Sequence, residues 1–167
     1  MSEPTRVPEP PDGDERDILL GWLAFHRDAL AAKCADLNGD QLTVRSALPS
    51  ALSLLGLVRH LTEMERAYGA WALGPATDLS LVWGEYTDGG PEWDFDAEAS
   101  MLADSMAAWA REKTATDTRV RAHASLDSVG GNGRTVRWNL LKLIGEYARH
   151  NGHADLLREL IDGRTGE

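Results

Sequence analysis

The sequence predicts an all-α protein, an up-down four-helix bundle with a long connection between its second and third helices. Four long segments carry apolar residues at alternating spacings of three and four, which is typical of amphipathic helices. No stretch shows sustained alternation of β-branched and polar residues, so no strand is predicted. A chain of 167 residues can bury a core large enough for one domain. Four helices of this kind favour a bundle.

The first helix is predicted over about residues 15–37 and the second over about residues 51–73. Asn38-Gly39 follows the first as a C-cap would, Pro49-Ser50 precede the second, and Gly74-Pro75 end it. The inner face of the first helix consists of Ile18, Trp22, Phe25, Ala29 and Ala32, and that of the second of Leu54, Leu57, Leu61, Met64, Tyr68 and Trp71.

The third helix is predicted to open at Asp94, a plausible N-cap, and the fourth to cover residues 136–162 with Gly163 as its stop. The inner face of the third consists of Phe95, Ala99, Leu102, Met106, Trp109, Thr116 and Val120. The connection over residues 74–93 is the longest, and loops of this length are often functional. Its aromatic residues either cover a substrate or close one end of the bundle: Trp83, Tyr86 and Trp93.

Composition restricts the domain organisation and the partners. Residues 1–13 hold four prolines and are expected to form a disordered tail, and residues 14–167 a single domain. No apolar run reaches the roughly 18 residues of a membrane span, and no secretory signal is present. Cys34 is the only cysteine, which suits a cytoplasmic protein. A net charge of −10 argues against nucleic acid and anionic membranes as partners. Bundles of this kind often form homodimers, which the sequence leaves open.

Three potential metal ligands share one face of the fourth helix. At about 100° per residue, with Glu146 at 0°, His150 falls near +40° and His153 near −20°. The same face is apolar, with Leu143, Tyr147, Ala154, Leu157 and Ile161. Burying imidazoles and a carboxylate is costly unless a partner satisfies them. Either a divalent metal or ordinary hydrogen bonds in the core could do so.

His60 lies in the middle of the second helix, at the edge of its apolar face. If the second and fourth helices are neighbours, His60 faces Glu146 and His150. Three protein ligands leave an open position, as in catalytic zinc sites. Three other side chains are interpreted as structural: His26 in the core, His123 at a helix C-terminus and Cys34 as a small buried hydrophobe.

The segments 14–16, 49–61 and 146–159, with Asp162-Gly163-Arg164, resemble the DinB-like superfamily, and within it the mycothiol transferase branch. The resemblance implies a four-helix bundle in which His60, Glu146 and His150 hold a divalent metal, zinc or alternatively nickel. It further implies a thiol S-transferase that joins a low-molecular-weight thiol such as mycothiol to an electrophilic small molecule.

The resemblance also concerns three neighbouring residues. His153 stands where other DinB-like branches often carry Gln, which places it behind the metal ligands or on the substrate side. His153 and Glu63 are the candidate catalytic residues, as proton relays. Close relatives carry His one turn before the Glu, where this chain has Lys142. A lysine there can pair with Glu146 and is expected to weaken the metal site rather than abolish it.

Alternative functions use the same residues. A metal-bound water in the same pocket would give a hydrolase or an isomerase. A bundle without turnover would be a sensor or carrier of a metal or a small ligand, and one that has lost its metal would be an interaction module.

Overall fold

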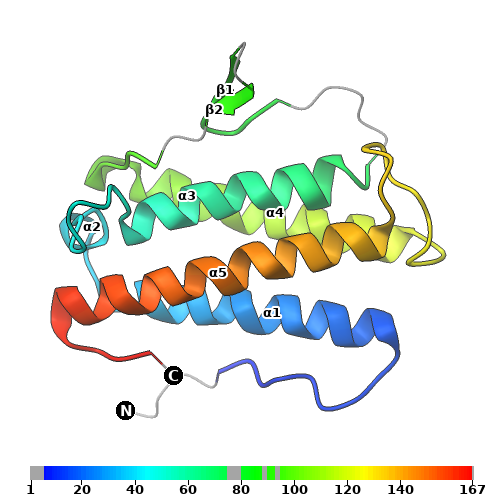
Figure 1. The fold of residues 1–167 in the computed structure, drawn as a ribbon, viewed down its shortest axis with the longest axis horizontal. Helices are drawn as coiled ribbons and strands as arrows, with labels where there is room; N and C mark the ends of the chain where they lie inside the picture. Colours follow the sequence, from blue (N-terminus) through cyan, green and yellow to red (C-terminus); the bar gives the residue numbers. More distant parts are fainter. Residues whose placement is uncertain (1–5, 75–79, 88–89, 93–94, 167) are drawn as a thin grey trace.

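The computed structural model describes residues 6–74, 80–87, 90–92 and 95–166, and in this part of the chain the fold is helical apart from one short hairpin (Figure 1). The all-α class is therefore confirmed, whereas the hairpin was not predicted. The helical elements are α1 (Glu15–Cys34), α2 (Gly39–Leu42), α3 (Leu54–Met64) with its π-helical continuation η1 (Glu65–Trp71), the 3-10 turn η2 (Ala99–Met101), α4 (Leu102–Ala122) and α5 (Val136–Asp162). The antiparallel strands are β1 (Glu85–Thr87) and β2 (Gly90–Glu92).

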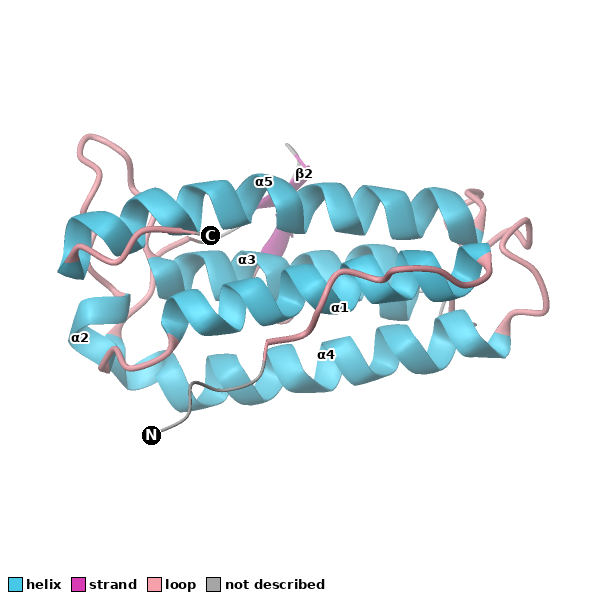
Figure 2. Ribbon diagram, turned by 90° about the horizontal axis from the view of Figure 1, so that it is seen from below, coloured by secondary structure: helices cyan, strands magenta, loops and turns pink. Residues whose placement is uncertain are grey.

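Helices α1 and α5 lie side by side and run in the same direction (Figures 1 and 2). Near their N-terminal ends, Arg137 of α5 donates two hydrogen bonds to the Glu15 carboxylate. Near their C-terminal ends, Arg158 donates to the backbone carbonyl of Lys33 at 2.9 Å. These contacts fix the relative register of the two helices.

Helices α3 and α4 also run parallel to each other, opposite in direction to α1 and α5 (Figure 1). Arg59 of α3 donates to Ser105 of α4 toward one end, and His123 lies 2.9 Å from the Leu73 carbonyl at the other. Simple up-down alternation of four helices is therefore wrong for this chain. Helix α4 thus begins at the same end of the molecule as α3.

Two helix boundaries differ from the predicted ones, because Asn38 and Ser53 cap the starts of helices. Helix α1 ends at Cys34, and Asn38 caps the short helix α2 by accepting a hydrogen bond from the Gln41 backbone N–H. Helix α3 begins after Ser53, which accepts from the Gly56 N–H at 3.1 Å. Helix α5 spans the predicted residues, between the N-cap Thr135 and Gly163 in the left-handed conformation.

The third long helix, α4, begins at Leu102 and not at residue 94 as predicted. The predicted cap Asp94 lies outside the described residues, and residues 95–98 form no helix. This segment runs close to α3, because a Cβ added to Gly56 would lie 2.4 Å from the carbonyl oxygen of Phe95. The close approach brings the Phe95 ring to α3 instead of placing it on the inner face of α4.

The core lies between the four long helices and consists largely of leucine. At most 1% of the surface of each of the following leucines is exposed: Leu23, Leu30, Leu54, Leu55, Leu57, Leu61, Leu140 and Leu143. Each fully buried leucine contributes roughly 1.5–3 kcal/mol relative to an exposed one. A polar network crosses this core. Arg27 forms a bidentate pair with Glu65 at 2.6 and 2.7 Å, Tyr147 donates to Glu65 at 2.8 Å, and Trp109 donates to Tyr147 at 2.7 Å.

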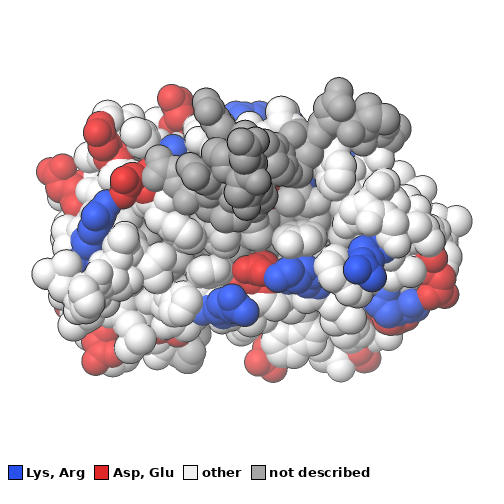
Figure 3. Space-filling model, turned by 45° about the horizontal axis from the view of Figure 1, so that its top comes forward, with Lys and Arg blue, Asp and Glu red and all other residues white. Residues whose placement is uncertain are grey.

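The N-terminal segment lies along α1 (Figure 2). Arg6 pairs with Asp28 at 2.6 Å, and Gly21 leaves room for Pro10, which would stand 2.7 Å from an added Cβ. Disorder of residues 1–13 stays a prediction, and residues 1–5 lie outside the described range. Among the described residues, no helix is both long and apolar enough to cross a membrane. Basic and acidic side chains are interspersed on the face shown in Figure 3.

Candidate metal centre

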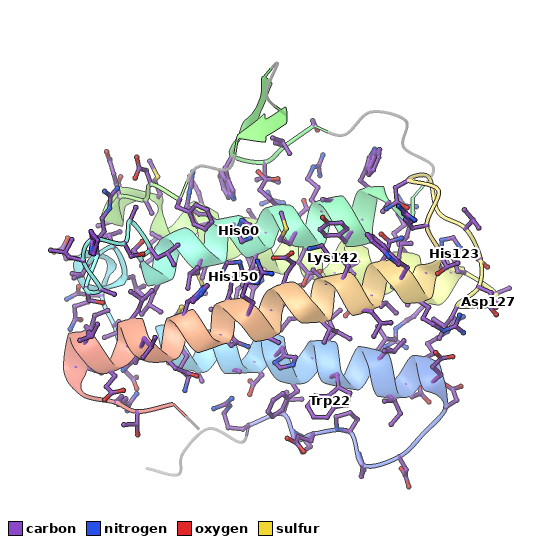
Figure 4. The ribbon with its side chains drawn as sticks, viewed as in Figure 1. Trp22, His60, His123, Asp127, Lys142 and His150 are labelled. Atoms are coloured by element: carbon purple, nitrogen blue, oxygen red, sulfur yellow. The ribbon has the colours of Figure 1, made fainter. Side chains whose placement is uncertain are left out.

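His60 of α3 and Glu146 and His150 of α5 form one cluster. Figure 4 shows the His60 and His150 side chains between α3 and α5. Each residue of the cluster offers one ligand atom, and these atoms all lie within 4.8 Å of one another. The three residues are buried, with 8%, 8% and 7% of their surfaces exposed. The structure therefore brings together the three residues that the sequence nominated as metal ligands.

The distances within the cluster fit a small divalent cation. The Nε2 atoms of His60 and His150 lie 3.8 and 3.6 Å from the same oxygen, Oε2 of Glu146. Nitrogen and oxygen ligands about 2.1 Å from a tetrahedral zinc stand roughly 3.4 Å apart, so only small shifts would be needed. Two imidazole nitrogens and one carboxylate oxygen form a donor set that zinc accepts.

The helices explain why these side chains meet. Glu146 and His150 are one turn apart on α5 and so lie on the same face. His60 reaches them from α3, which packs along α5. The Phe95 ring stacks on the His60 imidazole with ring centroids 4.8 Å apart and an interplanar angle of 25°. Sequence reasoning missed this role of Phe95, because the residue continues the apolar periodicity of the following helix.

The electrostatics favour neutral imidazoles beside an ionised carboxylate. Burial lowers the pKa of His60, an effect that Glu146 partly opposes. Burial and the neighbouring His60 and His153 rings lower the pKa of His150 to about 4. Burial would raise the pKa of Glu146, but the hydrogen bond and charge of Lys142 outweigh it and lower that pKa. Neutral imidazoles and a carboxylate are the protonation states that a metal requires.

Lys142 forms an ion pair with Glu146 through Oε1, and its ammonium also lies 5.5 Å from the centre of the Tyr68 ring. The oxygen that faces both imidazoles is the other one, Oε2. The lysine therefore occupies one carboxylate oxygen and leaves the second directed at the histidines. Hydrogen bonds of this kind orient the carboxylate ligands of metal sites.

His153 lies next to the cluster, one turn after His150 on α5. Its Nδ1 is 3.2 Å from Nδ1 of His150, whose Nε2 faces Glu146. A metal-binding histidine commonly donates its second ring N–H to a carboxylate, a backbone carbonyl or a water, which fixes its tautomer and orientation, and here Nδ1 of His153 stands in the place of that acceptor. The position behind a ligand that the resemblance implied for His153 agrees with this contact.

Glu63 is not part of the cluster and contacts the long connection instead. Its Oε1 accepts a hydrogen bond from the Trp83 backbone N–H at 2.5 Å. Burial raises the pKa of Glu63, although the N–H groups of residues 82–84 oppose this. Its second oxygen is buried and has no hydrogen-bond partner among the described residues. Arg59, one turn earlier, places its guanidinium 4.3 Å from the centre of the Trp83 ring.

Trp83 is thus held against α3 by its backbone and its ring. Of the other two aromatic residues in the connection, the Tyr86 side chain and all of Trp93 lie outside the described part of the structure. Of the three aromatic residues expected to cover a substrate, the structure therefore describes the side chain of Trp83 alone.

The remaining histidines and the cysteine have contacts that suit structural roles. Asn151 donates to the His26 carbonyl at 3.0 Å, and His123 ends α4 beside the Leu73 carbonyl. Cys34 is buried, and burial raises the pKa of its thiol to about 12. A thiol in this environment is inert, since only the thiolate is a strong nucleophile.

Comparison with known proteins gives one family. A family model described as mycothiol-S-transferase matches residues 18–163, which is most of the chain. No curated protein and no solved structure matches the chain. The matched range includes every residue of the candidate metal centre.

Proposed function

Because the chain belongs to the mycothiol-S-transferase family, we propose that it is a metal-dependent enzyme that joins a low-molecular-weight thiol to an electrophilic small molecule. The observation that carries this proposal is the buried cluster of His60, Glu146 and His150, with its single shared oxygen. We further propose that residues 14–167 form one domain with the four-helix bundle of DinB-like proteins. The thiol is of the mycothiol type.

We propose that His60 Nε2, His150 Nε2 and Glu146 Oε2 hold one divalent cation. Zinc is the preferred ion because the donor set is two nitrogens and one oxygen, and nickel is the alternative. A bound cation would supply deprotonation of a thiol at its open position. Lys142 and His153 would hold the carboxylate and the His150 ring in place through the contacts described above.

The protein's own residues would then manage the proton and the acceptor. With His150 bound through Nε2, its Nδ1–H would donate to Nδ1 of His153, so neutral His153 carries its hydrogen on Nε2. The Glu63 carboxylate would accept the thiol proton, and the Nε2–H of His153 would protonate the leaving group. As the sulfur–carbon bond forms, the leaving group departs with its electron pair. The second oxygen of Glu63, which is buried and has no hydrogen-bond partner in the described part of the chain, is the second proposed proton relay. Trp83, held over α3 by Glu63 and Arg59, would exclude water from the acceptor.

Metal analysis of purified variants tests the ligand assignment. His60→Ala and His150→Ala should each lose most of the bound metal that the wild type carries. His26→Ala is the matched control, because it removes an imidazole outside the cluster and should keep the metal. Full metal content in both cluster variants would contradict the assignment.

Cobalt substitution tests the thiol step separately. Adding mycothiol to the cobalt protein should produce a sulfur-to-metal charge-transfer band, and thiol should be consumed when an electrophile is present. A protein that binds cobalt but shows no band with mycothiol, cysteine or glutathione would contradict the transferase. Turnover without thiol would instead indicate the hydrolase or isomerase.

A further inference from the structure

The three ligands of the candidate metal centre are held by contacts of two different kinds. Glu146 and His150, the ligands on α5, each contact a polar side chain of the same helix, as described above. His60, the ligand on α3, contacts an aromatic ring from another part of the chain. This ring belongs to Phe95, which lies in the non-helical segment before η2 and so outside both ligand helices.

The His60 imidazole contacts two rings that restrict its plane. The Phe95 ring lies nearly parallel to it, with ring centroids 4.8 Å apart and an interplanar angle of 25°. The His150 ring meets it at 65°, with ring centroids 4.6 Å apart. A freely rotating side chain loses conformational entropy when it binds a metal, whereas a side chain that is already held in a stack has less to lose.

The Phe95 ring is itself held in place through its backbone. The carbonyl oxygen of Phe95 lies so close to α3 that a Cβ added to Gly56 would stand 2.4 Å from it. Gly56 precedes His60 by one helical turn, so the close approach and the ring stack lie on the same side of α3. The Phe95 side chain is half-buried and packs against the core. The packing of this segment on α3 therefore determines where the ring lies.

We propose that Phe95 is a positioning residue for the metal and acts through His60. This role rests on the proposed function, because it concerns the same metal centre. Phe95 holds the imidazole plane in advance, which reduces the entropy lost when Nε2 of His60 binds a cation. The face of the phenyl ring is electron-rich, so the stack also gains attraction when the imidazole becomes more positive on binding a cation. Both effects favour the metal-bound over the metal-free protein, as a change in affinity requires.

Competitive zinc titration of Phe95 variants tests this role. Phe95→Leu keeps an apolar side chain but removes the ring, and it should weaken zinc binding roughly tenfold, the lower end of the range for residues that orient metal ligands. Phe95→Tyr keeps the ring and should bind zinc as the wild type does. Phe25→Leu is the matched control, because the Phe25 ring contacts the imidazole of His26 outside the cluster, with ring centroids 5.4 Å apart. Its zinc affinity should be unchanged.

A second variant displaces Phe95 without altering its side chain. In Gly56→Ala the new Cβ would collide with the Phe95 carbonyl oxygen, so the segment must move away from α3 and the stack should loosen. Zinc binding should weaken here too, although alanine is a better helix former than glycine. Gly152→Ala is the control, since an added Cβ there meets nothing within 4 Å on the helix of the other two ligands.

Visible spectra of the cobalt-substituted proteins separate positioning from a loss of folding. The absorption bands of bound cobalt report the geometry of its ligands, so Phe95→Leu and Gly56→Ala should shift these bands at saturating cobalt. A variant that is only less stable should keep them. Zinc binding by the wild type that neither variant weakens would overturn the role of Phe95 and leave the proposed function standing. Absence of zinc binding by the wild type would overturn both.

Discussion

Among single residues, Glu146 determines the candidate metal centre, because its two carboxylate oxygens face different partners. Oε1 meets the Lys142 ammonium, and Oε2 faces the nitrogens of His60 and His150. A buried carboxylate with one cation on one oxygen is held in a fixed orientation. The same cation repels a metal ion placed near the other oxygen. Orientation and repulsion thus act in opposite directions at this residue.

Competitive zinc titration of Lys142 variants measures which effect is larger. We expect Lys142→Ala to bind zinc about twofold more tightly than the wild type. Lys142 is partly exposed, and an i,i+4 ion pair of this kind contributes only about 0.2–0.5 kcal/mol, which zinc must overcome. Lys142→His should bind still more tightly, because it adds a nitrogen ligand one turn before Glu146. Equal affinities in all three proteins would show that Lys142 does not oppose the metal.

Because of Cys34, the free energy of unfolding should fall as pH rises above 9. Burial raises the pKa of its thiol from 9.0 to about 12, so the unfolded chain loses this proton at lower pH than the folded protein does. The stabilising contribution of the protonated thiol is therefore complete below pH 9 and is lost as pH rises toward 12. Urea unfolding at pH 8 and pH 10.5 should show a larger loss of stability in the wild type than in Cys34→Ala. Rapid labelling of the native thiol at pH 8 would contradict the prediction.

Among the elements, α5 was predicted to the residue, whereas α4 and α1 were not. Gly163, the predicted stop, acts locally and does not depend on distant contacts, and in the structure the Thr135 side chain caps the other end by accepting from the Trp138 N–H. Phe95 continues the helical periodicity but lies in a non-helical segment, because its packing on α3 and His60 outweighs local propensity. Asn38 is equally compatible with ending one helix and capping the next.

The π-helical continuation of α3 packs closely on α4 at Gly69. A Cβ added there would lie 2.0 Å from Oγ1 of Thr116, which is itself fully buried and donates to the Glu65 carbonyl. Gly69→Ala should therefore destabilise the protein by roughly 1–3 kcal/mol in urea unfolding, because overpacking displaces the two helices.

Gly152→Ala is the control for this effect. An added Cβ meets nothing within 4 Å at Gly152, so the substitution should stabilise helix α5 by up to about 1 kcal/mol. If both substitutions changed the free energy of unfolding equally, the close contact at Gly69 would be irrelevant to stability.

For the molecule as a whole, the sequence assigned the ligands to the correct helices. It predicted the wrong relative directions of the helices, because up-down alternation would make α3 and α4 antiparallel. Glu146 and His150 share a face by spacing alone, and His60 was placed opposite them from its position on the second helix, in agreement with the family resemblance. Helices α3 and α4 run parallel, and the sequence between them contains no periodic signal from which this could be predicted. The contact between Glu63 and Trp83 was equally inaccessible, because it joins segments 20 residues apart through a backbone N–H.

Metal binding should stabilise the whole fold, because the proposed ligands come from two helices that meet only in the folded state. A ligand that binds only the folded protein adds about 2.7 kcal/mol of stability at a free concentration of 100 Kd. For a chain of this size each kcal/mol raises Tm by roughly 2–4 °C, so saturating zinc should raise Tm by about 5–11 °C. Removing zinc with a chelator should reverse the change. For each variant, the shift is the difference in Tm with and without zinc. His60→Ala should lose this shift, whereas the control His26→Ala should keep it. A shift of the same size in His60→Ala would show that zinc stabilises the protein from another site.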